Sequence, residues 1–227
     1  MTQIFLTFGD SWPAAVKLSD KSLSFPSLIA KELGFEILNL SEPATSIEHA
    51  VMALLHFLET QYNKDNKYLA LCCLTDPSRN MIWEPAAGQI TDPPETFWAP
   101  SCYTREMQIN NNHPSVEYYY KYIQTERMDT YNYVKNVILF STLCEKFNID
   151  LYFVNNFNTI ELQFKLTNGI NIYPRTLREI LKTINYNEVG GQNNNRNFNP
   201  VYVDHTGHPT VAGHRMIADA LISWIKQ

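Results

Sequence analysis

The sequence predicts an α/β protein: a three-layer α/β/α sandwich around a central, mostly parallel β-sheet. Three observations support this prediction. Short apolar runs alternate with longer segments of helical periodicity, as in successive βα units. The runs are apolar throughout, as in strands that are buried on both faces. Hydrophobic residues make up 44% of the 227-residue chain, which is enough for a sizeable core.

In the first part of the chain we expect a strand at Ile4–Leu6, which ends in a turn at Phe8–Trp12. A helix follows near Pro26–Leu33, because Pro26 suits the first helical turn and Gly34 stands just past the end. The apolar run Ile37–Leu40 predicts the second strand.

The remaining elements follow from the same two periodicities. We expect helices at 47–61, 115–125, 130–147, 176–184 and 209–225, and strands at 68–74 and 150–155. Residues 76–115 and 185–200 have neither pattern and are rich in turn-forming residues. We therefore expect one domain over residues 1–227, with long irregular insertions in these two segments.

Composition restricts the classes of function. A net charge of −5 disfavours a nucleic-acid-binding surface. No apolar run approaches the roughly 18 residues that span a bilayer, and the N-terminus does not resemble a signal peptide, so we expect a cytoplasmic protein without a membrane span. The cysteines show no metal-ligand spacing, and we expect them to be reduced and structural: Cys72, Cys73, Cys102 and Cys144.

The turn at Phe8–Trp12 presents the first chemical signal. Ser11 follows a glycine directly after a buried strand, an arrangement that exposes a hydroxyl for nucleophilic attack. Near the other end of the chain, Asp204 precedes His208, and Pro209 then starts a helix. An imidazole held by a carboxylate can act as the general base for a serine.

Together these blocks resemble the SGNH (GDSL) hydrolases, whose fold is flavodoxin-like. That family has a Gly-Asp-Ser after the first strand and an Asp-x-x-His loop near the C-terminus, continued here by Gly213-His214. The resemblance implies Ser11 as nucleophile, His208 as base and Asp204 as the acid, with no cofactor. Asp204 stands four residues before His208 instead of three. The acid can therefore come from elsewhere, or a Ser-His dyad can use a backbone carbonyl.

The middle blocks of the family supply the oxyanion hole, and here they diverge. Ala44 stands where the family typically has a glycine, and Thr75 stands where it has an asparagine. The resemblance implies that the N–H groups of Ser11 and Ala44, with Thr75, bind the oxyanion. The Thr-x-Pro-x-Arg stretch from Thr75 to Arg79 is similar to SGNH-like domains of some phage proteins.

Further residues are candidates for binding the substrate. We expect Asp10, Trp12, Arg79 and His113 to contact it, although aromatic side chains of the long loop can equally be packing residues. A metal site formed by His205, His208, His214 and Asp204 is the alternative reading of the C-terminal loop, but the spacing matches no established zinc pattern. We expect no metal.

The expected function is a serine hydrolase that acts on a carbohydrate O-acetyl ester or on a lipid or other acyl ester. The expected partner is therefore a small-molecule or carbohydrate ester. Two alternatives stay open: a weakly catalytic or non-catalytic binding module, such as a phage carbohydrate-binding component, and an acyltransferase that uses the same residues.

Overall fold

The computed structural model describes residues 1–77, 79, 125–157, 170–181 and 200–227. Its sheet has four parallel strands in the order β2-β1-β3-β4 within these residues. The strands are β1 (Gln3–Phe8), β2 (Glu36–Asn39), β3 (Lys67–Leu74) and β4 (Ile149–Asn155). All four strands therefore end at the same edge of the sheet, as parallel strands must.

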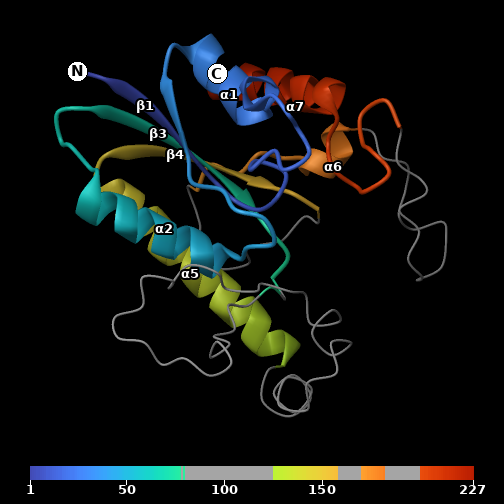
Figure 1. Cartoon of the computed structure of the whole chain (residues 1–227). Helices are drawn as coiled ribbons and strands as arrows, with labels where there is room; N and C mark the ends of the chain where they lie inside the picture. The colour runs from blue at the N-terminus through green and yellow to red at the C-terminus, as the bar shows by residue number, and fades with distance from the viewer. Residues whose placement is uncertain (78, 80–124, 158–169, 182–199) are drawn as a thin grey trace, which may run out of the picture.

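Helices cover both faces of the sheet (Figure 1). On one face lie α1 (Phe25–Leu33) and α7 (Val211–Ile225), with the short α6 (Leu177–Ile180) beside α7. On the other face lie α2 (Ile47–Thr60) and α5 (Glu126–Lys146). A one-turn 3-10 helix, η1 (Lys21–Leu23), precedes α1. The predicted three-layer α/β/α sandwich is confirmed.

An apolar core lies on each face of the sheet, between the strands and the helices that cover them. Successive side chains of a strand point to opposite faces and so belong to different cores. Phe5 of β1 packs toward α1 and α7, and the adjacent Leu6 packs toward α2 and α5. In β3, Leu69 and Leu71 join the first core while Ala70 and Cys72 join the second. Both faces of these strands are buried, which explains why the runs are apolar throughout.

Side-chain caps set the helix boundaries. Thr210 accepts a hydrogen bond from the Gly213 N–H, so α7 begins at Val211 and not at Pro209 as expected. Thr125 caps α5 in the same way, so this helix starts four residues before the expected Thr130. The expected helix at 115–125 lies outside the described residues apart from Thr125, as do nearly all of the expected insertions at 76–115 and 185–200.

Three of the four cysteines are described, and all three are free and buried. Burial raises the pKa of Cys72 and of Cys73 well above the ordinary value, and that of Cys144 to about 12. A thiol that resists ionisation is a poor nucleophile, so these cysteines act as core residues, as expected. Cys102 lies outside the described residues.

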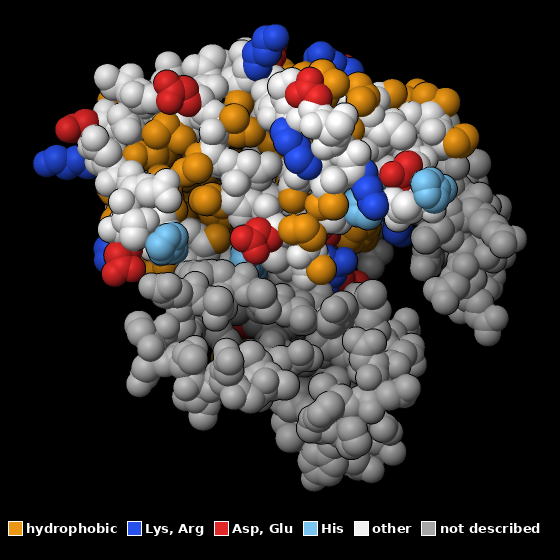
Figure 2. Space-filling model, viewed as in Figure 1, with side chains coloured by type: hydrophobic (Ala, Val, Ile, Leu, Met, Phe, Trp, Pro, Cys, Tyr) orange, Lys and Arg blue, Asp and Glu red, His pale blue; other side chains and the backbone are white. Residues whose placement is uncertain are grey.

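The surface shown in Figure 2 carries lysine, arginine, aspartate and glutamate side chains interspersed with one another. Apolar side chains also reach this surface (Figure 2). Among the described residues β2 lies at the edge of the sheet, and its Ile37 is 39% exposed. Among the described helices, none combines the length and the apolar character needed to cross a membrane.

His214 joins α7 to the start of α1. It is buried, its Nδ1 accepts the Phe25 N–H at 3.2 Å, and its ring stacks on the Phe25 ring. Burial, with smaller electrostatic contributions from Lys21 and the His208 ring, lowers the pKa of His214 from 6.5 to about 4. The folded protein therefore keeps this histidine neutral at pH values where the unfolded chain protonates it.

Stability should consequently fall as the pH drops from 6.5 toward 4, by about 1.4 kcal/mol per pH unit from this residue alone. His214→Asn places an oxygen acceptor near the Nδ1 position and cannot titrate, so its stability should depend less on pH over that range. Urea unfolding at several pH values measures this, with the exposed His205→Asn as the matched control. If the free energy of unfolding of His214→Asn depended on pH as steeply as that of the wild type, His214 would not be the source of the pH dependence.

Candidate active site

The turn after β1 is possible because residue 9 is a glycine. Gly9 has a φ of 139°, and a Cβ atom there would lie 2.8 Å from the Cys73 Cβ and 2.9 Å from the Cys73 carbonyl oxygen. Any larger residue would push β1 away from β3. Gly9 therefore lets the chain turn sharply at the edge of the sheet and places Ser11, which is partly exposed, just beyond it.

Asp10 holds this turn in place. It is fully buried, and its Oδ1 accepts hydrogen bonds from the Trp12 N–H at 3.1 Å and from the Asn156 side-chain amide at 2.9 Å. Its Oδ2 pairs with the Arg79 guanidinium at 3.0 Å. The carboxylate thus connects the end of β1 to the ends of β3 and β4. These contacts are all with the protein, and the expected contact of Asp10 with a substrate stays a prediction.

Trp12 connects the serine turn to the C-terminal loop. Its indole Nε1 donates to the Gly207 carbonyl oxygen at 3.2 Å, across 195 positions of sequence. Trp12 follows Ser11 directly, and Gly207 immediately precedes His208. The structure therefore brings the two segments that carry the expected nucleophile and base against each other. Trp12 is buried, so its expected role toward the substrate also stays a prediction.

The loop from Asp204 to His208 is organised around one carboxylate oxygen. Oδ1 of Asp204 accepts from the Thr206 N–H at 2.8 Å, the Thr206 hydroxyl at 2.6 Å and the His208 backbone N–H at 3.1 Å. The Thr206 hydroxyl oxygen lies 3.0 Å from Nδ1 of His208. Within the described contacts, Asp204 thus reaches the imidazole through Thr206 and not directly.

The environment of Asp204 favours its ionised form. Partial burial alone would raise the pKa of this carboxyl group, but the hydrogen bonds from Thr206 and from the His208 backbone, with the nearby His208 ring, outweigh it. The pKa of Asp204 therefore lies below its usual value. The group is an anion at neutral pH and accepts hydrogen bonds only.

The loop after β2 is fixed to the serine turn. The Glu42 N–H and the Thr45 hydroxyl both donate to the Gly9 carbonyl oxygen, at 3.0 Å and 2.9 Å. Between them, Ala44 is exposed and has a φ of 58°, in the left-handed region that glycine prefers. Among the described residues, neither the Ser11 N–H nor the Ala44 N–H makes a hydrogen bond.

Thr75, the third expected oxyanion donor, follows β3 directly. Its hydroxyl oxygen is buried and has no hydrogen-bond partner among the described residues. Because β2, β1 and β3 are neighbours and parallel, Ala44, Ser11 and Thr75 follow the carboxyl ends of three adjacent strands.

Sequence reasoning missed the contribution of β4. Asn156, just past its end, donates to Asp10, and Phe157 packs edge-on against Trp12 with ring centroids 5.3 Å apart. The guanidinium groups of Arg79 and Arg178 lie 5.8 Å and 5.4 Å from the centre of the Phe157 ring. Two adjacent asparagines at the end of an apolar run were the signal available in the sequence.

The remaining candidates are dispersed. His205 is exposed, and His214 is engaged with Phe25 as described above. Across the described part of the chain, no three histidine, cysteine, aspartate or glutamate side chains gather as a metal site requires. Arg79 pairs with Asp10, so its expected contact with substrate stays a prediction, and His113 lies outside the described residues.

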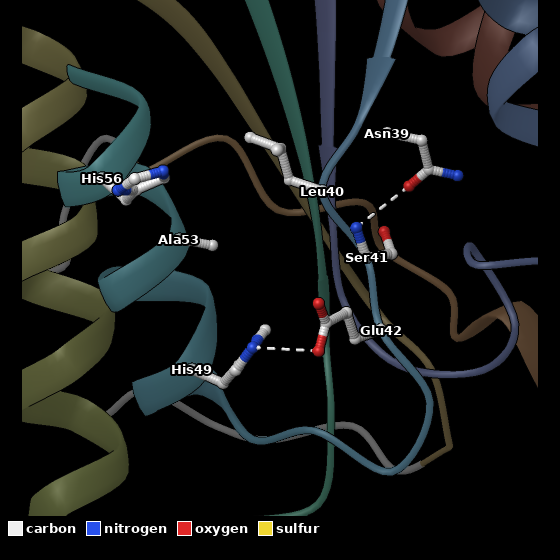
Figure 3. Close-up of a pocket in the computed structure, with 7 residues that line it drawn as sticks. All are labelled: Asn39, Leu40, Ser41, Glu42, His49, Ala53 and His56. Atoms are coloured by element: carbon white, nitrogen blue, oxygen red, sulfur yellow. Dashed lines mark hydrogen bonds and ion pairs between the residues drawn. The ribbon is translucent and has the colours of Figure 1, made fainter. Parts of the chain in front are cut away.

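A hollow of about 280 Å³ opens beside the loop that carries Ala44 (Figure 3). His49 of α2 and Glu42 point toward each other across it, with Nε2 and Oε2 3.4 Å apart. Burial lowers the pKa of His49, although the charge of Glu42 opposes this. Both polar and apolar residues line the hollow: Asn39, Leu40, Ser41, Glu42, His49, Ala53 and His56.

No family model matches the sequence, and no curated protein matches it. Solved structures do match over the whole chain. TesA superposes with a TM-score of 0.55 at 12% identity, covering 99% of this chain and 98% of TesA. A putative lipolytic protein of the G-D-S-L family from Desulfitobacterium hafniense superposes with a TM-score of 0.54 at 8% identity, covering 98% of this chain and 99% of that protein.

The esterase EstA of Pseudoalteromonas sp., in a structure inhibited by monoethylphosphonate, gives a TM-score of 0.53 at 11% identity, with 98% of this chain and 96% of EstA covered. Identities this low show the architecture alone. The chain therefore has the fold of the SGNH (GDSL) hydrolases.

Proposed function

We propose that the protein is an SGNH-type esterase that hydrolyses a small-molecule or carbohydrate ester through an acyl-enzyme on Ser11. The observation that carries the proposal is the hydrogen bond from Trp12 to the Gly207 carbonyl. This bond joins the residue after Ser11 to the residue before His208. The bond supports the proposal because it brings the segments that carry Ser11 and His208 together near the carboxyl end of β1, where parallel α/β proteins place their active sites.

In this mechanism the Ser11 Oγ attacks the ester carbonyl carbon, and His208 Nε2 takes the hydroxyl proton. The negative charge that develops on the carbonyl oxygen is bound by the N–H groups of Ser11 and Ala44 and by the Thr75 hydroxyl. When the intermediate collapses, the alcohol leaves with the proton from His208. Water then attacks the acyl-enzyme with the same histidine as base, and Ser11 regains its proton as the acid is released.

The hollow beside Ala44 offers both polar and apolar surface to a substrate. Its hydroxyl, amide, imidazole and carboxylate groups can hydrogen-bond the hydroxyl groups of a sugar, and its apolar surface can contact a sugar ring or a short acyl group. A carbohydrate esterase is among the solved structures that match, with a TM-score of 0.52 at 13% identity and coverage of 100% of this chain and 68% of that one. An O-acetylated carbohydrate is therefore the substrate class to test first.

The second candidate is a carbohydrate-binding module that retains the fold with weakened catalysis, for instance a phage component. The burial of the Thr75 hydroxyl favours it, because a donor without exposed surface has to be uncovered before an oxyanion can reach it. The same carbohydrate esterase is described by the divergent catalytic and non-catalytic binding functions of its active site. An acyltransferase would use the same residues with a different acceptor.

Reaction with a fluorophosphonate probe separates the two candidates. A working Ser-His pair should be phosphonylated at Ser11, and Ser11→Ala should lose both labelling and hydrolysis of p-nitrophenyl acetate while it stays folded. Mass spectrometry of the labelled peptide identifies the residue, and Ser19→Ala, a change at an exposed serine, is the matched control. Hydrolysis by Ser11→Ala at the wild-type rate would exclude Ser11 as nucleophile, whereas a folded, unlabelled wild type that binds acetylated sugars would favour the binding module.

The mechanism also requires that the serine turn be rigid, and this depends on the pair formed by Asp10 and Arg79. Arg79→Met leaves a buried carboxylate without its counterion, which should cost about 3 kcal/mol of stability. Arg215→Met breaks an exposed pair with Asp219 and should cost less than about 0.5 kcal/mol. Chemical unfolding measures both changes.

The double variant Asp10→Asn with Arg79→Met removes both charges and should be more stable than Arg79→Met alone. The single variant Asp10→Asn completes the comparison. If the double variant lost as much free energy of unfolding as the two single variants lose together, the two residues would not be energetically coupled.

A further inference from the structure

We propose that Thr206 is a positioning residue whose hydroxyl connects the Asp204 carboxylate to Nδ1 of His208. This inference rests on the proposed function and assigns a role to a residue that the family pattern leaves unspecified. In place of a direct carboxylate–imidazole contact, the orienting path would run from Asp204 through Thr206 to His208.

The positions of the atoms determine where the protons lie. An ionised carboxylate only accepts, so the single hydroxyl proton of Thr206 is donated to Asp204 Oδ1, over 2.6 Å. The Thr206 oxygen then offers a lone pair to His208 Nδ1, 3.0 Å away. Nδ1 must therefore carry the ring proton and donate it. A neutral imidazole with a proton on Nδ1 has a free lone pair on Nε2, which is the state that a general base needs.

The spacing of the loop explains why an intermediary is needed. The Asp204 N–H donates to the His208 carbonyl oxygen at 2.8 Å, and the His208 N–H donates back to Asp204 Oδ1 at 3.1 Å. These two bonds close the loop and turn the carboxylate toward the backbone of His208. The hydroxyl of Thr206 bridges the carboxylate and the ring, and the bond from Trp12 to Gly207 fixes the loop on the serine turn.

We call the path from Asp204 through the Thr206 hydroxyl to His208 the relay. If it operates, the Thr206 hydroxyl is required and the methyl group is dispensable. A threonine with a purely structural role would not need its hydroxyl in this way. Thr206→Ser keeps the hydroxyl, and Thr206→Val keeps the shape and removes it. His205 precedes Thr206 in the same loop and is exposed. The variant His205→Asn is therefore the control that measures the effect of an arbitrary substitution in this loop.

The first experiment measures kcat and KM for p-nitrophenyl acetate in these variants, with thermal unfolding to confirm that each is folded. Thr206→Val should lower kcat on the order of a hundredfold with little change in KM, because the orientation of a general base contributes to the transition state. Thr206→Ser should retain kcat within about threefold of the wild type. Wild-type kcat in Thr206→Val, or equal losses in the serine and valine variants, would overturn the proposal.

The second experiment reads the tautomer and needs no activity. Nitrogen-15 NMR of histidine-labelled protein reports which ring nitrogen carries the proton, and the spectrum of His208→Asn assigns the His208 signals. Wild type and Thr206→Ser should show the proton on Nδ1, and Thr206→Val should lose that preference. A wild-type His208 with its proton on Nε2 would overturn the relay even in an active esterase. A protein without esterase activity that shows the expected tautomers would instead refute the proposed function and leave the relay standing.

Discussion

The site depends on one buried carboxylate. Asp10 has no exposed surface, and it is stabilised only because a guanidinium, a side-chain amide and a backbone N–H converge on it from three segments of the chain. A buried charge without such partners would cost several kcal/mol, so the ends of β1, β3 and β4 must assemble together or not at all. The residue that follows Asp10 is Ser11. Its position is therefore set by the same contacts that satisfy its neighbour.

The parallel arrangement of the strands brings together the other loops around Ser11. Since β2, β1 and β3 are adjacent and run in the same direction, the segments that follow them meet at one edge of the sheet. Two hydrogen bonds to the Gly9 carbonyl oxygen then fix the loop of Ala44 on the serine turn. Ala44 adopts a left-handed backbone that disfavours a side chain, at a cost of roughly 1 kcal/mol. A strained residue held by its neighbours at a site of this kind is commonly part of the function.

Most of the described strands and helices could be read from the sequence because each is a local pattern. The helix expected at 176–184 is an exception, since α6 ends at Ile180. Apolar runs gave the strands, and Pro26 with Gly34 marked the first helix, which the structure places at Phe25–Leu33. Ser11 and His208 stand out as motif residues. The partners of Asp10 could not be found in this way, because Arg79 and Asn156 are 69 and 146 positions distant in sequence. Only the order of the strands brings them together, and no periodicity encodes such a contact.

Three differences from the SGNH pattern that the sequence resembles share one physical property. Ala44 stands where that pattern has a glycine, Thr75 stands where it has an asparagine, and the spacing from Asp204 to His208 is longer by one residue. In each case a hydrogen-bonding group remains: a backbone N–H at Ala44 that has no partner among the described residues, a hydroxyl at Thr75 and a second hydroxyl at Thr206. Acyl transfer requires donors and acceptors at particular points in space, and it does not require particular residue types. A motif search counts residue types and treats all three positions as losses, whereas the proposed mechanism depends on hydrogen-bonding atoms, and each of the three positions keeps one.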